Sequence, residues 1–277
     1  MLNKLAGQRA AAVIAAIGVA ALAAACGSSG ASSSRSSTAT TASAAATTSS
    51  QTTAAAPGGG SAPTVLAAAS LTKVFPAIDP GAKFSFGGSG ALATQIEQGA
   101  PADVYAAASP KSPAMLLQKG LIDKPVVFAT NTLVLIVPKS NSAHITSVSD
   151  ITKPGVKIVI CNATVPCGDY ARTAFMNLEI TSRAMKNVVS QTTDVTQTVA
   201  EVATGQADAG FVYITDAKAA NGKVAVVRLP AAAKPGTKDL IAVVKKAPNP
   251  AAAKAFMAMV TSSQGQAKLQ AAGFGKP

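Results

Sequence analysis

The sequence predicts an α/β protein in which mainly parallel sheets are flanked by helices. Between residues 65 and 119, short apolar strands alternate with helical patterns, an order typical of parallel β-α-β units. Thr132–Val137 is a continuous apolar run, as expected for a strand that is covered on both faces. Glycine follows two helical patterns, at Gly120 and Gly205, where it favours the end of a helix. These observations predict two α/β units side by side.

The first unit is expected to begin with three strands separated by helices. The expected strands are Val65–Ala69, Lys83–Phe86 and Val104–Ala107, and the expected helices are Leu71–Ile78, Ala91–Gln98 and Pro113–Lys119. Pro76 or the Pro80-Gly81 pair is expected to break the first of these helices. A small-residue turn at 87–90 comes before the second helix.

The second unit continues the alternation, and two further helices close the chain. Its expected strands are Thr132–Val137, Lys157–Cys161, Ala209–Ile214 and Val224–Leu229, followed by Ile241–Val244. The expected helices are Val148–Ile151, Tyr170–Leu178, Val195–Thr204, Pro250–Thr261 and Gly265–Ala272. No internal repeat of fixed period is visible.

The candidate binding residues share one position, at the end of a strand or the start of a helix. They are Ser70, Ser89, Cys167, Val195 and Tyr213. Ligands of open parallel sheets bind beyond the carboxyl ends of the strands, and helix N-termini present unpaired N–H groups to anions. Small residues with hydroxyl groups and accessible backbone amides in such places predict a site for a small anion.

The N-terminus has the pattern of a lipoprotein signal peptide, residues 1–25. Lys4 and Arg9 precede the apolar run Ala10–Ala25, which at about 16 residues is shorter than the roughly 20 that a membrane-spanning helix needs. Cys26 then follows four residues from Leu22 to Ala25, as at a lipidation site. We therefore expect an extracytoplasmic protein anchored to the cell membrane through Cys26. A permanent membrane anchor and plain secretion are the alternatives.

Residues 26–62 are expected to form a disordered tether rich in Ser, Thr and Ala. Arg35 is their only charged residue, and the stretch has almost no apolar surface to offset the entropy of ordering. The part from residue 63 onward carries 21 Lys and Arg against 12 Asp and Glu, a net charge of +9. Because these basic residues are scattered and aromatic residues are few, nucleic-acid binding is not expected.

Two cysteines remain once Cys26 is assigned to the lipid anchor. Cys161 and Cys167 form an even pair in an oxidising compartment, which favours a disulfide. Closing so short a loop contributes roughly 2 kcal/mol in the entropy model. A metal site that also uses His144, the only histidine, and a catalytic pair of cysteine and histidine are the alternatives.

Several blocks, in order along the chain, resemble the molybdate-binding proteins of ABC importers. The blocks are Ala67–Thr72, Phe84–Val104, Phe128–Asn131, Ala163–Gly168, Ala207–Tyr213 and Gly273–Gly275. This resemblance implies a two-lobed periplasmic-binding-protein fold of type II. Its first lobe would comprise residues 63–131 plus 240–277, and its second lobe residues 132–239. Thr132–Val137 and Ile241–Val244 are the expected crossings between the lobes.

The resemblance also implies how the anion is held. Ser70 and Ser89 would provide hydroxyls and amides from the first lobe. Cys167 and Val195 would provide backbone amides and Tyr213 a phenolic hydroxyl from the second lobe. This chain departs from many relatives at Gly90, where they have a second serine, and at Cys167, where the family usually has alanine. Its segment between Ser70 and Ser89 is also shorter than in many relatives.

We therefore expect a monomeric solute-binding protein, not an enzyme, that takes molybdate, and tungstate as well, and passes the ion to an ABC permease. No cofactor is expected, and the metal would be held only through its oxyanion, without direct metal ligands. The alternatives are a binder of sulfate or another tetrahedral oxyanion, a thiol enzyme using Cys161, Cys167 and His144, and a surface adhesion lipoprotein.

Overall fold

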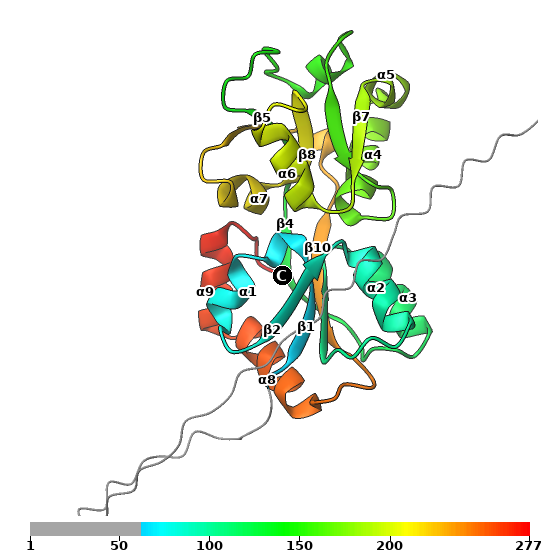
Figure 1. Ribbon diagram of the computed structural model, residues 1–277, viewed down its shortest axis with the longest axis vertical. Helices are drawn as coiled ribbons and strands as arrows, with labels where there is room; N and C mark the ends of the chain where they lie inside the picture. Colours follow the sequence, from blue (N-terminus) through cyan, green and yellow to red (C-terminus); the bar gives the residue numbers. More distant parts are fainter. Residues whose placement is uncertain (1–61) are drawn as a thin grey trace, which may run out of the picture. The chain divides into compact units, whose positions relative to one another are not determined.

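The computed structural model of the chain describes residues 62–277 (Figure 1). The predicted signal peptide, Cys26 and all of the tether except Ala62 lie outside the described residues. Within 62–277, no helix is long and apolar enough to cross a membrane.

Two five-stranded sheets organise this part of the chain, in the order β2-β1-β3-β10-β4 and β7-β6-β8-β5-β9. The first sheet contains β1 (Thr64–Ala68), β2 (Lys83–Gly87), β3 (Val104–Ala107), β4 (Val126–Asn131) and β10 (Thr237–Val243). The second contains β5 (Leu133–Pro138), β6 (Ile158–Cys161), β7 (Val188–Thr192), β8 (Ala209–Tyr213) and β9 (Val224–Val227). We call each sheet with its helices a lobe. The predicted two-lobed α/β fold is confirmed.

Both sheets are mixed, where the sequence predicted mainly parallel ones. In the first sheet β1 pairs in parallel with β2 and β3, whereas β10 is antiparallel to β3 and β4. The second sheet repeats this arrangement, with β6 parallel to β7 and β8, and β5 antiparallel to β8 and β9. In each sheet one antiparallel strand lies next to the parallel strands: β10 in the first sheet and β5 in the second. The chain enters each of these strands from the other lobe.

Helices cover both faces of the first sheet (Figure 1). On one face lie α2 (Ser89–Glu97) and α3 (Lys111–Gln118), and on the other α1 (Val74–Ile78), α8 (Pro250–Thr261) and α9 (Ser263–Ala272). Because side chains alternate along a strand, Leu66 of β1 packs with the α2 cluster while Val65 and Ala67 pack on the opposite face. Pro76 is tolerated in the first turn of α1, and this helix ends before Pro80.

The second lobe carries α4 (Pro166–Asn177), α5 (Thr181–Lys186), α6 (Val195–Ala203) and α7 (Ile214–Ala219). Short 3-10 turns complete the fold at Ala69–Leu71 (η1), Val148–Thr152 (η2) and Ala231–Ala233 (η3). The predicted helix Leu71–Ile78 is therefore split into η1 and α1, and α2 begins at Ser89 rather than at Ala91.

The chain passes between the lobes twice, and the two passages are tied together. The first lies at Thr132, between β4 and β5, and the second lies between β9 and β10. The backbone N–H of Asn131 donates to Thr237 Oγ1 at 2.8 Å, and its side-chain amide donates to Thr215 Oγ1 at 3.0 Å. Of the predicted crossing at Thr132–Val137, only Thr132 lies between the sheets, because β5 pairs within the second sheet from Leu133 onward. The predicted crossing at Ile241–Val244 is wrong, because β10 already pairs within the first sheet from Thr237 onward.

Candidate functional site

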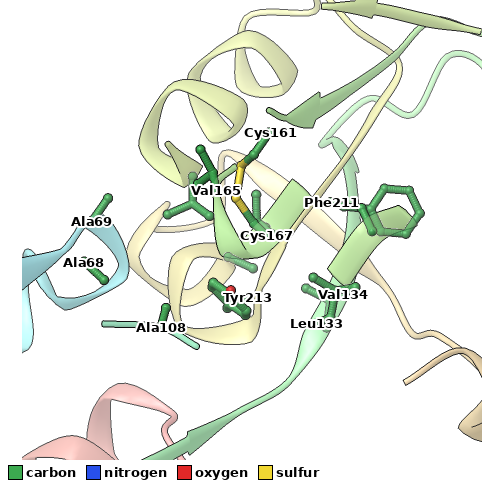
Figure 2. Close-up of a cluster of buried hydrophobic side chains, with 14 of the residues drawn as sticks. Ala68, Ala69, Ala108, Leu133, Val134, Cys161, Val165, Cys167, Phe211 and Tyr213 are labelled. Atoms are coloured by element: carbon green, nitrogen blue, oxygen red, sulfur yellow. A yellow bond between two sulfur atoms is a disulfide. The ribbon is translucent and has the colours of Figure 1, made fainter. Parts of the chain in front are cut away.

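All five candidate residues line one cavity, where the two lobes meet. The cavity is small and partly open to solvent. Its walls are made by Ala68, Ala69, Ser70, Gly87, Gly88, Ser89 and Ala108 of the first lobe and by Val165, Pro166, Cys167, Asp194, Val195 and Tyr213 of the second. Figure 2 shows Ala68, Ala69 and Ala108 facing Cys167 and Tyr213.

Ser89 is held in place by the strand beside it. It is the first residue of α2, so its amide belongs to the first turn, where N–H groups have no carbonyl partner within the helix. Its Oγ accepts the Ala108 N–H at 3.1 Å, and its carbonyl oxygen accepts the Tyr105 hydroxyl at 2.7 Å. Because the Ala108 bond uses Ser89 Oγ as an acceptor, the hydroxyl hydrogen can still be donated to an anion in the cavity.

Two helices of the second lobe begin at the cavity. Cys167 is the second residue of α4, and its side chain forms a disulfide with Cys161 at the end of β6, with the two Cα atoms 5.8 Å apart (Figure 2). This is the pairing that the sequence favours. At α6 the Asp194 side chain accepts the amides of Thr196 and Gln197 at 2.8 and 3.1 Å. The Asp194 side chain does not accept the Val195 N–H, so this first-turn amide remains available as a donor at the cavity wall.

Two buried hydroxyl groups have no hydrogen-bond partner among the described residues, and both line the cavity. They are Ser70 Oγ of the first lobe and Tyr213 OH of the second, on residues that are 9% and 1% exposed. Burial raises the pKa of Tyr213 well above its usual value, and nearby Asp239 adds to this effect, so the phenol keeps its proton. A buried hydroxyl without a partner is costly, and a ligand that accepts hydrogen bonds from both lobes would satisfy these two.

No lysine or arginine lines the part of this cavity that the structure describes, and the one charged side chain there is Asp194. Residue types alone did not predict this carboxylate as part of the wall. Its Oδ1 accepts two α6 amides, and the positive end of that helix favours its charge. The site therefore offers neutral donors, with the only full charge directed into a helix cap.

Two further acids, which the sequence did not reveal, lie buried near Tyr213. Asp216 Oδ2 accepts the Tyr213 N–H at 3.0 Å, and burial raises the pKa of Asp216 to about 7. Asp239 of β10 is 1% exposed, and neither of its carboxyl oxygens has a partner among the described residues. Burial, followed by the charge of Asp216, raises the pKa of Asp239 well above its usual value. This raised pKa disfavours the charged form of Asp239 and so weakens its repulsion of an anion.

The alternatives that need thiol or metal chemistry find no support here. Both sulfurs of Cys161 and Cys167 are in the disulfide, and His144 is not among the residues that line the cavity. Within residues 62–277, no group of three or more His, Cys, Asp or Glu side chains is placed to hold a metal ion.

Comparison with known proteins gives a consistent family assignment. A family profile described as "Bacterial extracellular solute-binding protein" matches residues 63–275. The molybdate-binding protein ModA of Mycobacterium tuberculosis is 41% identical over 223 residues, 77% of this chain and 84% of that protein. The Haemophilus influenzae ModA is 33% identical over 184 residues, covering 61% and 72%.

The fold agrees with this assignment. The periplasmic molybdate-binding protein of Azotobacter vinelandii superposes with a TM-score of 0.68 at 24% identity, over 77% of this chain and 99% of that structure. At this level of identity the likeness supports the fold alone. The relatives with higher identity are solute-binding proteins rather than enzymes.

Proposed function

Because this chain belongs to the family of bacterial extracellular solute-binding proteins, we propose that it captures molybdate between its two lobes and delivers the ion to an ABC permease. The observation that carries the proposal is the pair of buried hydroxyls without partners, Ser70 Oγ and Tyr213 OH, which line one cavity from opposite lobes. The relatives named as molybdate-binding proteins support the choice of ligand.

The donor set suits a tetrahedral dianion whose four oxygens only accept hydrogen bonds. The hydroxyls of Ser70, Ser89 and Tyr213 would donate together with the amides of Cys167 and Val195. A hydrogen bond to a charged group contributes about 1.5–3 kcal/mol, so several of them can offset the desolvation of the anion without a buried cation. Tungstate carries the same charge and shape, and we include it among the ligands.

Other parts of the proposal concern the place and mode of action. A lipid on Cys26 would hold the protein at the membrane surface, and residues 26–62 would let the two lobes reach the permease. The protein would act as a monomer, and its first lobe would include β10 from Thr237 onward rather than begin again at residue 240. Opening would turn the lobes about the linked segments at Asn131 and Thr237.

Thermal unfolding with added oxyanions tests the proposal. A ligand present at 100 times its dissociation constant stabilises the protein by about 2.7 kcal/mol. For a protein of this size that corresponds to a rise in Tm of roughly 5–11 °C. Molybdate and tungstate should produce this rise, and sulfate and phosphate should produce much less. A protein whose Tm responds to sulfate but not to molybdate would belong to the alternative oxyanion class.

A further inference from the structure

The two lobes approach each other closely at two glycines beside the cavity. Gly88 is the N-cap of α2, and Gly90 is the second residue of that helix. A Cβ atom on Gly88 would lie 2.5 Å from the carbonyl oxygen of Thr193, and one on Gly90 would lie 2.6 Å from the carbonyl oxygen of Thr164. Both oxygens are backbone atoms of the second lobe, so the first lobe contacts it here without room for a side chain.

The need for glycine here is one of space and not of backbone conformation. Gly88 has φ −65° and ψ 131°, which any residue adopts, and Gly90 is likewise outside the left-handed region. Val165 adds to the crowding, because its side chain would lie 3.4 Å from a Cβ on Gly88. Gly90 does not line the cavity, so its effect on a ligand would act through the distance between the lobes.

We propose that Gly88 and Gly90 set how far the lobes close, and that they thereby determine the affinity of the cavity for its oxyanion. This inference rests on the proposed function. A carbon atom normally stays about 3.3–3.6 Å from a carbonyl oxygen, so a Cβ on Gly90 requires a displacement of about 0.7–1 Å.

The turn that carries Thr164 is the more rigid partner. The Val165 N–H donates to the Asn162 carbonyl oxygen at 3.0 Å, and the disulfide closes the same turn from Cys161 to Cys167. The chain, in contrast, runs between the lobes only at Thr132 and between β9 and β10 within the described residues, and the polar links between the lobes there are few, among them the Asn131–Thr215 hydrogen bond and the exposed Lys111–Asp169 ion pair. Movement is therefore expected between the lobes. If the second lobe moves away by about 0.7–1 Å, its donors lie too far for a good hydrogen bond to an anion that the first lobe holds.

The test compares Gly90→Ala with Gly81→Ala as a control in the same lobe. A Cβ on the exposed Gly81 would meet only the side-chain Oδ1 of Asp79, at 3.3 Å, and Gly81 lies outside both the cavity wall and the passages between the lobes. Calorimetry with molybdate should show binding at least tenfold weaker for Gly90→Ala, because one or more charge-assisted bonds are lost, and unchanged binding for the control. Gly88→Ala should be weakened at least as much. Circular dichroism should show the same folded content in all variants.

Two results would overturn the inference. One is equal molybdate affinity in wild type, Gly90→Ala and Gly81→Ala. The other is an unchanged separation of the lobes, measured without ligand from the radius of gyration in small-angle X-ray scattering or from crystal structures, where Gly90→Ala should be more open than wild type. The scattering comparison does not depend on the ligand. If wild type bound no oxyanion, the proposed function would fail while the closure claim was still tested.

Discussion

Replacing Tyr213 by phenylalanine should change stability and binding in opposite directions. The Tyr213 hydroxyl is buried and has no partner among the described residues. A buried polar group without a partner costs about 1–3 kcal/mol, so Tyr213→Phe should stabilise the ligand-free protein by up to that amount. At roughly 2–4 °C per kcal/mol, the Tm without ligand should rise by several degrees.

With molybdate the same substitution should be harmful. Loss of one hydrogen bond to a charged ligand removes about 1.5–3 kcal/mol, which weakens binding roughly 10- to 150-fold. At a molybdate concentration 100 times the wild-type dissociation constant, wild type gains about 2.7 kcal/mol, whereas a variant weakened 100-fold gains only about 0.4 kcal/mol. Scanning calorimetry with and without molybdate measures both effects in one series.

Ser89→Ala provides the contrast within the same cavity. Ser89 Oγ accepts the Ala108 N–H at 3.1 Å, so removing it leaves a buried amide without a partner. This variant should lose both molybdate affinity and ligand-free stability, the latter by about 1–3 kcal/mol. If Tyr213→Phe lowered the ligand-free Tm as Ser89→Ala does, or if it bound molybdate like wild type, the assignment of the Tyr213 hydroxyl to the anion would be refuted.

Three further predictions concern charge, pH and the disulfide. Asp194→Asn keeps an α6 cap but removes a negative charge beside the dianion, so calorimetry should show molybdate binding that is severalfold tighter; weaker binding would contradict this. Between pH 3.8, the ordinary pKa of an aspartate, and about pH 7, the folded protein holds more protons at Asp216 than the unfolded chain does. The free energy of unfolding should therefore fall as the pH rises through this window. The Tm should therefore drop less between about pH 5 and pH 8 in Asp216→Asn than in wild type, and equal drops would be inconsistent with a raised pKa of Asp216. Replacing Cys161 and Cys167 together by serine should cost about 2 kcal/mol in chemical denaturation and weaken molybdate binding, because the Cys167 amide is then less firmly placed; unaltered binding would show that the turn is rigid without the bond.

The parts of the fold that the sequence predicted are those with local signals. Buried apolar runs and glycines at the ends of helices predicted the positions of most elements, whereas β4 and β7 were not predicted as strands. Both are edge strands with partly exposed side chains; polar residues interrupt β7, whereas Val126–Ala129 of β4 is a short apolar run that was not assigned to a strand. The start of α2 at Ser89 was placed two residues too late, because Gly88 and Gly90 suggested a turn.

The candidate site was also only partly predictable from the sequence. The positions of Ser70 and Tyr213 at strand ends could be inferred from the chain, but the absence of partners for their hydroxyls depends on which atoms the other lobe brings near. Asp239 looks in the sequence like any surface acid, and its burial results from the pairing of β10 within the first sheet. Nothing in the sequence gives the distance from Gly90 to Thr164.

The arrangement of donors suggests why binding and release would follow one movement. Ser89 is fixed within the first lobe by Tyr105 and Ala108, and Val195 is positioned within the second by the Asp194 cap. Each lobe is thus preorganised on its own, which limits the entropy that binding must overcome. Without a cation among the described wall residues, neither lobe alone offers enough donors for a dianion. Closure would therefore create the site, and separation of the lobes at the permease would halve the donor set and release the ion without any chemical change in the protein.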